Sequence, residues 1–150
     1  MNKHPPSDFS PLQDDRVPRG VGCVGLYSSA STWAFNVTAS LLRLADGGGV
    51  VPFYGDDIDE IALRKIERSN SFVLKSHLPG PSVRALCEIG RLPVLLTVRD
   101  PRDAVVSLMQ RFGQDFGAAL DRVERSANLV LHLSERIEHL YYGMKMGLLA

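Results

Sequence analysis

The chain has 150 residues, of which 45% are hydrophobic and 23% charged. These values are ordinary for a globular protein, and the length suffices for one domain with a substantial core. Basic and acidic residues number 17 each, so the formal net charge is zero. Because a nucleic-acid partner requires a basic excess or patch, we expect no such partner, and any bound anion must be held locally.

The amino-terminal residues 1–19 are rich in proline and polar residues and are expected to form a flexible lead, with a single domain over 20–150. The lead has no continuous apolar region typical of a signal peptide, and the chain has no run approaching the ~18 apolar residues of a membrane span. Cys23 and Cys87 lack the spacing of a metal site or redox motif. We therefore expect two buried free thiols in a cytoplasmic protein.

Short apolar runs alternate with helical patterns along the domain. The predicted strands are Val21–Tyr27, Val50–Tyr54, Ser71–Ser76 and Val94–Val98. The predicted helices are Thr32–Leu44, Asp56–Arg68, Ser82–Ile89, Pro101–Phe112 and Asp115–Tyr142. Strands alternating with helices predict an α/β fold, a parallel β-sheet with helices on both faces.

The last predicted helix repeats apolar residues at helical spacing, at Leu120, Val123, Ala127, Val130, Leu131, Ile137 and Leu140. We expect this stripe to pack on the core of its own domain; packing on a second copy, which would make a homo-oligomer, is the alternative. His132 and His139 lie on this helix without ligand partners nearby in sequence, and we interpret them as structural.

The loop after the first strand, Ser28–Ser31, consists of small residues and leads into a helix. Such a loop presents backbone N–H groups and the positive end of a helix dipole to an anion. The alternative is simple N-capping by a serine or threonine. The loop lacks the GxxxxGK[ST] pattern, which disfavours an ordinary ATP- or GTP-hydrolysing P-loop. Residues 20–25 fit GxGxxG but lie within the predicted strand, so we reject dinucleotide binding.

Arg99 follows the fourth predicted strand, at the edge of the sheet where open α/β folds bind ligands. Pro101 suits the first position of a helix, and Ser107 lies about two turns into it. The planar guanidinium of arginine matches phosphate oxygens, so this segment is suited to holding a phosphate. The alternative is an ion pair of Arg99 with Asp100 or Asp103.

Lys75 and His77 end the third predicted strand. Residues two apart point to the same face of a strand, so both side chains are expected over one pocket. A lysine stabilises charge on a leaving oxygen, and a histidine removes a proton from a hydroxyl near neutral pH. The alternative is an exposed pair in a loop.

Taken together, three segments resemble motifs of one enzyme family. Residues 27–33 read YSSASTW, residues 75–79 read KSHLP, and Arg99, Pro101, Asp103 and Ser107 fit RxPxDxxxS. In this order they are similar to the PKSGTTW loop, the KTHLP motif and the 3′-phosphate motif of sulfotransferases that use 3′-phosphoadenosine 5′-phosphosulfate (PAPS). The resemblance spans about residues 21–112.

The resemblance implies a three-layer, P-loop NTPase-like α/β sandwich that transfers the sulfuryl group of PAPS, without a metal, to a hydroxyl or amine of a small molecule or glycan. It assigns His77 as the general base that takes the acceptor's proton, and Lys75 as a residue that assists transfer at the sulfuryl group. Trp33 would stack on adenine. The cofactor-binding residues it implies are Ser28, Ser29, Ala30, Ser31, Thr32 and Trp33 toward the 5′ side, and Arg99 and Ser107 at the 3′-phosphate.

Two departures from the family pattern leave an alternative open. Ser28 replaces the loop lysine, and the chain stops at Ala150 without the family's glycine-rich basic segment. It resembles a truncated relative, a fragment, or a half-site that another chain completes. The alternative function is a catalytically weak or inactive module that binds PAPS or its bisphosphate product. A small kinase is disfavoured by the missing lysine.

Overall fold

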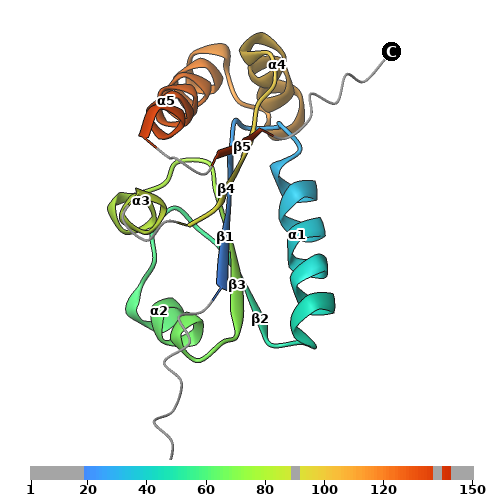
Figure 1. Ribbon diagram of the computed structural model, residues 1–150. Coiled ribbons are helices and arrows are strands. Elements are labelled where there is room, and N and C mark those ends of the chain that lie inside the picture. The colour runs from blue at the N-terminus through green and yellow to red at the C-terminus, as the bar shows by residue number, and fades with distance from the viewer. Residues whose placement is uncertain (1–18, 89–91, 137–139, 143–150) are drawn as a thin grey trace, which may run out of the picture.

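The protein forms a three-layer α/β structure around one parallel β-sheet (Figure 1), as seen in a computed structural model that describes residues 19–88, 92–136 and 140–142. The strands lie in the order β2-β3-β1-β4-β5, and every neighbouring pair is parallel. The strands are β1 (Arg19–Gly25), β2 (Val50–Tyr54), β3 (Ser71–Ser76), β4 (Val94–Thr97) and β5 (Leu140–Tyr142). The helices are α1 (Ser31–Asp46), α2 (Glu60–Glu67), α3 (Pro81–Glu88), α4 (Pro101–Phe112) and α5 (Phe116–Arg136).

Helices cover both faces of the sheet, which is why β3 is buried at every position. Helix α1 packs on one face, where Ala39 contacts Cys23 and Val73. Helices α2, α3 and α5 pack on the other face, around Leu74 and Leu96. The predicted α/β class is therefore confirmed.

The ends of α1 and α4 follow local sequence signals. Gly47 ends α1 in the left-handed conformation and donates its N–H to the Arg43 carbonyl. Pro101 opens α4 behind Asp100, whose carboxylate accepts from the Arg102 N–H. The predicted bounds of β2, β3 and α4 are confirmed.

The predicted helix Asp56–Arg68 begins too early. Helix α2 starts at Glu60, behind Asp59, whose carboxylate accepts from the Ala62 N–H at 2.7 Å. Asp56 has another role, because its carboxylate accepts from Ser76 Oγ at 2.7 Å and from the Leu78 N–H at 3.1 Å. These bonds hold the start of the segment against the end of β3 rather than in a helix.

The predicted helix Asp115–Tyr142 is wrong in its last part. Helix α5 ends at Arg136, and Leu140–Tyr142 forms β5, which pairs in parallel with β4. Tyrosine favours strands, and this pairing covers the edge that β4 would otherwise expose. Leu140 therefore belongs to the sheet and not to the helical stripe. The predicted lead over 1–19 lies outside the described residues except for Arg19, which belongs to β1 and not to a flexible lead. Ile137 and His139 of the predicted helix also lie outside the described residues.

Both cysteines are free and buried, as predicted. Burial raises the pKa of Cys23 to about 11 and that of Cys87 to about 12, so both thiols are protonated at neutral pH. His132 lies 3.5 Å from a Glu88 carboxylate oxygen. None of the described helices is both long enough and apolar enough to cross a lipid bilayer.

The strand order creates a crevice between β1 and β4. From β1 the chain leads to β2 on one side of the sheet, whereas from β4 it leads to β5 on the other side. Ligands of open α/β sheets bind outside the carboxyl ends of strands at such a switch point. The loops after β1 and β4, residues 26–30 and 98–100, both open onto this crevice.

Candidate functional site

The loop after β1 enters α1 through two strained residues. Ser28 and Ala30 have φ angles of 58° and 64°, in the left-handed region that residues other than glycine seldom adopt. Ala30 is the N-cap of α1, and no side-chain hydrogen bond caps the helix. The capping interpretation is therefore wrong. The first N–H groups of α1 have no partner within the helix and remain available to an anion.

Ser29 braces this loop against β4. Its hydroxyl donates to the Leu26 carbonyl at 2.6 Å, so the 2.7 Å contact with Thr97 Oγ1 must have threonine as its donor. Ser29 is buried and lies beneath the loop. The structure thus places Ser29 in support of the loop after β1 rather than on its surface.

Gly25 allows this close packing of β1 on β4. A Cβ atom at Gly25 would clash with Thr97 Oγ1, lie 2.6 Å from the Thr97 carbonyl oxygen and lie 2.8 Å from Ser29 Oγ. We expect Gly25→Ala to lower the free energy of unfolding by about 1–3 kcal/mol, because over-packing forces backbone shifts. Urea unfolding measures the loss. Gly22→Ala is the matched control, since its Cβ would meet nothing closer than 3.4 Å; an equal loss in both variants would contradict this role.

Arg99 and Ser107 converge on the same loop. Arg99 Nη1 donates to the Ser28 carbonyl at 3.1 Å, and Ser107 Oγ donates to Ser28 Oγ at 3.0 Å. Two sequence motifs far apart in the chain thus meet at one residue. A group bound by the loop after β1 would lie beside the guanidinium of Arg99.

The alternative ion pair of Arg99 is present in part. Arg99 Nη2 lies 3.5 Å from Asp103 Oδ2, and the Asp103 side chain is 64% exposed. Asp100 has a closer partner, because its carboxylate accepts from Arg102 Nη2 at 2.6 Å. A long, solvated ion pair contributes little to stability. Asp103 therefore leaves Arg99, whose side chain is one-third exposed, able to exchange this partner for a ligand.

Lys75 points from β3 toward the start of α1. Its Nζ donates to Thr32 Oγ1 at 2.8 Å and lies 4.5 Å from the centre of the Tyr54 ring. Burial lowers the pKa of Lys75 from its ordinary value of 10.5. The ammonium group therefore sits at the junction of the loop and α1, in a site that disfavours uncompensated positive charge.

His77 is held in one tautomer. Its Nδ1 lies 2.8 Å from the Gly25 carbonyl oxygen, and a carbonyl only accepts, so Nδ1 carries the proton and Nε2 keeps a lone pair. The imidazole also stacks on Tyr27, with ring centres 4.4 Å apart. Burial is the main cause that lowers the pKa of His77 below 6.5. At neutral pH the side chain is an uncharged base with a fixed orientation.

These groups line one cleft of about 770 Å³ at the carboxyl edge of the sheet. Eight of the ten predicted site residues line it directly, and Trp33 is 61% exposed there. They are Ser28, Ala30, Ser31, Thr32, Trp33, Lys75, His77 and Arg99. Ser29 and Ser107 instead support the lining through their hydrogen bonds. The expectation that Lys75 and His77 face one pocket is confirmed.

Every charged side chain that lines the cleft is basic. Arg111 and Arg122 join Lys75 and Arg99 in the wall, which makes the cleft attractive to a polyanion. Arg111 lies one turn beyond Ser107 on α4, a spacing that could have identified it from sequence. Arg122 reaches the cleft only because α5 folds back on α4, so no local pattern in the sequence indicates it.

Within the described ranges, no group of three or more metal-binding side chains could hold an ion. Comparison with protein-family models, with curated proteins and with solved structures gave no match to this chain. The function of this protein is therefore inferred from the chemistry of the residues that line the cleft.

Proposed function

We propose that this cleft binds PAPS and that the protein transfers its sulfuryl group to a hydroxyl or amine acceptor. One observation carries the proposal: the three motif segments lie in one basic cleft, and the segment that contains Arg99 and Ser107 hydrogen-bonds through both side chains to Ser28 of the loop segment. The strand, strained loop and helix around Ser28 also favour a P-loop-like fold, in which this unit binds phosphate groups.

In this proposal the 5′-phosphosulfate lies against the uncapped start of α1, and the 3′-phosphate lies beside Arg99. Lys75 supplies the cation that the loop lacks at Ser28, since its Nζ reaches Thr32 at the start of α1. His77 Nε2 takes the proton of the acceptor. The acceptor oxygen or nitrogen bonds to sulfur as the bond from sulfur to the phosphate oxygen breaks, leaving adenosine 3′,5′-bisphosphate.

Differential stabilisation by two nucleotides tests the cofactor. We expect adenosine 3′,5′-bisphosphate to raise the melting temperature more than ADP at equal concentration, because a ligand that binds only the native state stabilises it. ADP has the same number of phosphates but none at the 3′ position. Equal shifts, or none, would rule out PAPS. Release of the bisphosphate from PAPS with an acceptor panel then measures transfer.

A second candidate function is a binding module with weak or no transfer. It is favoured by Ser28, which offers a hydroxyl, already hydrogen-bonded to Ser107, where the family pattern has a lysine. Loss of a cation aimed at developing charge costs several kcal/mol of transition-state stabilisation. Binding of the bisphosphate without turnover on any acceptor would select this function over the enzyme.

The variant Ser28→Lys measures what the missing loop cation costs. We expect its rate of transfer to rise about tenfold, because a second ammonium would join Lys75 at the phosphosulfate. Ser28→Met is the control, since it adds a long side chain without charge. The rate of bisphosphate release from PAPS is the measurement. Equal rates in Ser28→Lys and Ser28→Met would show that Lys75 already supplies the charge that transfer requires.

A further inference from the structure

Two arginines of the cleft, Arg111 and Arg122, lie outside the three motifs. In the part of the chain that the structure describes, neither forms an ion pair with a carboxylate, whereas Arg125, on the same helix as Arg122, pairs with Asp121 at 2.8 Å. An arginine that faces a cleft without an acidic partner presents its full set of donors to a ligand.

Arg122 and the proposed base both contact the ring of Tyr27. The Cζ atom of Arg122 is 5.9 Å from the centre of the Tyr27 ring, and Tyr27 stacks on His77 with ring centres 4.4 Å apart. One aromatic ring thus links the guanidinium to the imidazole. An acceptor whose hydroxyl reaches His77 Nε2 would have to extend about the width of this ring for a further substituent to meet Arg122.

We propose that Arg122 selects acceptors that carry an anionic group, such as a carboxylate, one aromatic ring away from the reacting hydroxyl. This inference rests on the proposed function, and it names the class of acceptor. Arg122 takes no proton and forms no covalent bond in the transfer. It orients the acceptor through charge-assisted hydrogen bonds so that its hydroxyl faces His77.

The test compares an acid with its neutral amide. Protein saturated with adenosine 3′,5′-bisphosphate is titrated calorimetrically with 4-hydroxyphenylacetate and with 4-hydroxyphenylacetamide, and the acid is expected to bind about tenfold more tightly. Arg122→Ala should remove this difference and Arg122→Lys should keep part of it. Arg125→Ala, which removes an ion-paired arginine outside the cleft, should keep all of it.

Equal binding of acid and amide by the wild type, or an undiminished difference in Arg122→Ala, would overturn the inference. In a protein that turns over, the same substitution should raise KM for the acid more than it lowers kcat. The titrations are repeated without the bisphosphate. If the protein does not bind the nucleotide, the proposed function is contradicted. The titrations without bisphosphate then still show whether Arg122 recognises the acid.

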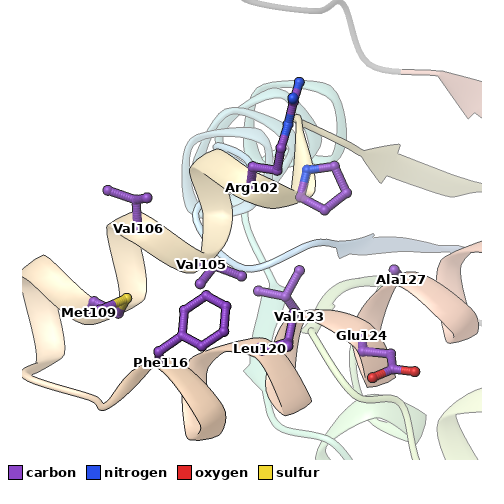
Figure 2. A pocket seen from close by; sticks show the side chains of 10 residues that line it. Arg102, Val105, Val106, Met109, Phe116, Leu120, Val123, Glu124 and Ala127 are labelled. Atoms are coloured by element: carbon purple, nitrogen blue, oxygen red, sulfur yellow. The ribbon is translucent and has the colours of Figure 1, made fainter.

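A separate feature is the apolar groove between α4 and α5 (Figure 2). The groove has a volume of about 450 Å³, and Val106, Phe116 and Leu120 within it are at least 43% exposed. Apolar side chains that are exposed side by side are suited to contact with another protein surface. Two charged residues also line the groove, Arg102 from α4 and Glu124 from α5.

The two charges make the groove complementary to itself. Helices α4 and α5 run in opposite directions after the turn at 113–115, so Arg102 and Glu124 lie at the same end of the pair. A two-fold axis parallel to the helices would set each α4 against the α5 of a second copy. The same rotation brings Arg102 of each copy opposite the glutamate at position 124 of the other copy, so the dimer contains two such contacts.

The geometry points to a second copy of this chain as the occupant of the groove, in an antiparallel four-helix arrangement. Arg102 uses its Nε and Nη2 on Asp100, at 3.0 and 2.6 Å, which leaves Nη1 for the partner. Among the described residues, Glu124 has no ion pair within its own chain. The apolar side chains of the groove would form the centre of the interface.

Sedimentation velocity over a range of concentrations tests the dimer. The wild type should sediment as a dimer, and Leu120→Glu as a monomer, because a charge would enter the interface. Leu131→Glu is the matched control: Leu131 is an exposed leucine on the same helix, outside the groove, and its variant should remain dimeric. A wild type that is monomeric at every concentration would overturn the proposed interface. Dimers in all three proteins would overturn it as well, because the groove would then not be where the copies meet.

Charge reversal tests the orientation. Arg102→Glu and Glu124→Arg should each be monomeric alone, since each places like charges opposite one another at both contacts. An equimolar mixture should form a heterodimer, because both contacts then pair a glutamate with an arginine. A mixture that stays monomeric while Leu131→Glu dimerises would overturn the proposed two-fold arrangement.

Discussion

Replacing His77 by glutamine is expected to reduce sulfuryl transfer by about 10²–10⁴-fold, the usual contribution of a general base. Glutamine keeps a polar side chain that can donate to the Gly25 carbonyl, as Nδ1 of His77 does at 2.8 Å. It offers no basic nitrogen to the acceptor. The rate of bisphosphate release from PAPS at saturating acceptor measures the loss.

The same variant should bind adenosine 3′,5′-bisphosphate as tightly as the wild type, because the proposed phosphate contacts come from the α1 start and from Arg99. His132→Gln is the matched control, since His132 does not line the cleft and lies near Glu88. Transfer at the wild-type rate in His77→Gln would exclude His77 as the base. A parallel loss of nucleotide binding would mean instead that His77 supports the loop.

The pH dependence follows from the environment of His77. Burial, with the nearby Lys75 charge, lowers the pKa of His77 below 6.5, against the opposing effect of its bond to Gly25. Transfer requires the uncharged imidazole, so the rate should rise with pH through this lowered pKa and then become constant above it. In Lys75→Met the loss of a positive neighbour should move the rise toward higher pH.

Parts of the fold could be predicted because their signals are local. The apolar run of β3 and the Asp100–Pro101 start of α4 each specify an element without help from distant residues. The start of α2 could not be predicted, because the Asp56 carboxylate accepts hydrogen bonds at the end of β3 that only the tertiary structure creates. The strand β5 was hidden for the same reason: its pairing partner, β4, lies far away in the chain.

The candidate site divides in the same way. The motif residues around Ser28, His77 and Arg99 could be identified from sequence because each follows a strand of a parallel sheet, and such ends meet at one edge. The sequence could not place the tip of Lys75 on Thr32, since this contact depends on how α1 packs beside β3. It also missed Arg122, which the return of α5 on α4 brings into the cleft.

The substitution Arg99→Ala is expected to remove the preference for adenosine 3′,5′-bisphosphate over ADP. A hydrogen-bonded contact to a charged group contributes about 1.5–3 kcal/mol, so affinity for the bisphosphate should fall roughly 10- to 100-fold. Affinity for ADP should change much less, because ADP has no phosphate at the 3′ position. Calorimetric titration of both nucleotides gives the ratio, and Arg64→Ala, an exposed arginine that pairs with Glu60, serves as the control.

Arg99 also donates to the Ser28 carbonyl at 3.1 Å. Loss of this hydrogen bond in Arg99→Ala would disturb the loop and lower the affinity for both nucleotides alike. The ratio of the two affinities separates these effects, since only loss of a 3′-phosphate contact changes it. Asp103→Asn provides the opposite test, because it removes the carboxylate that lies 3.5 Å from Arg99. Its affinity for the bisphosphate should rise while that for ADP stays constant. An unchanged ratio in both variants would show that Arg99 shapes the loop and does not bind the 3′-phosphate.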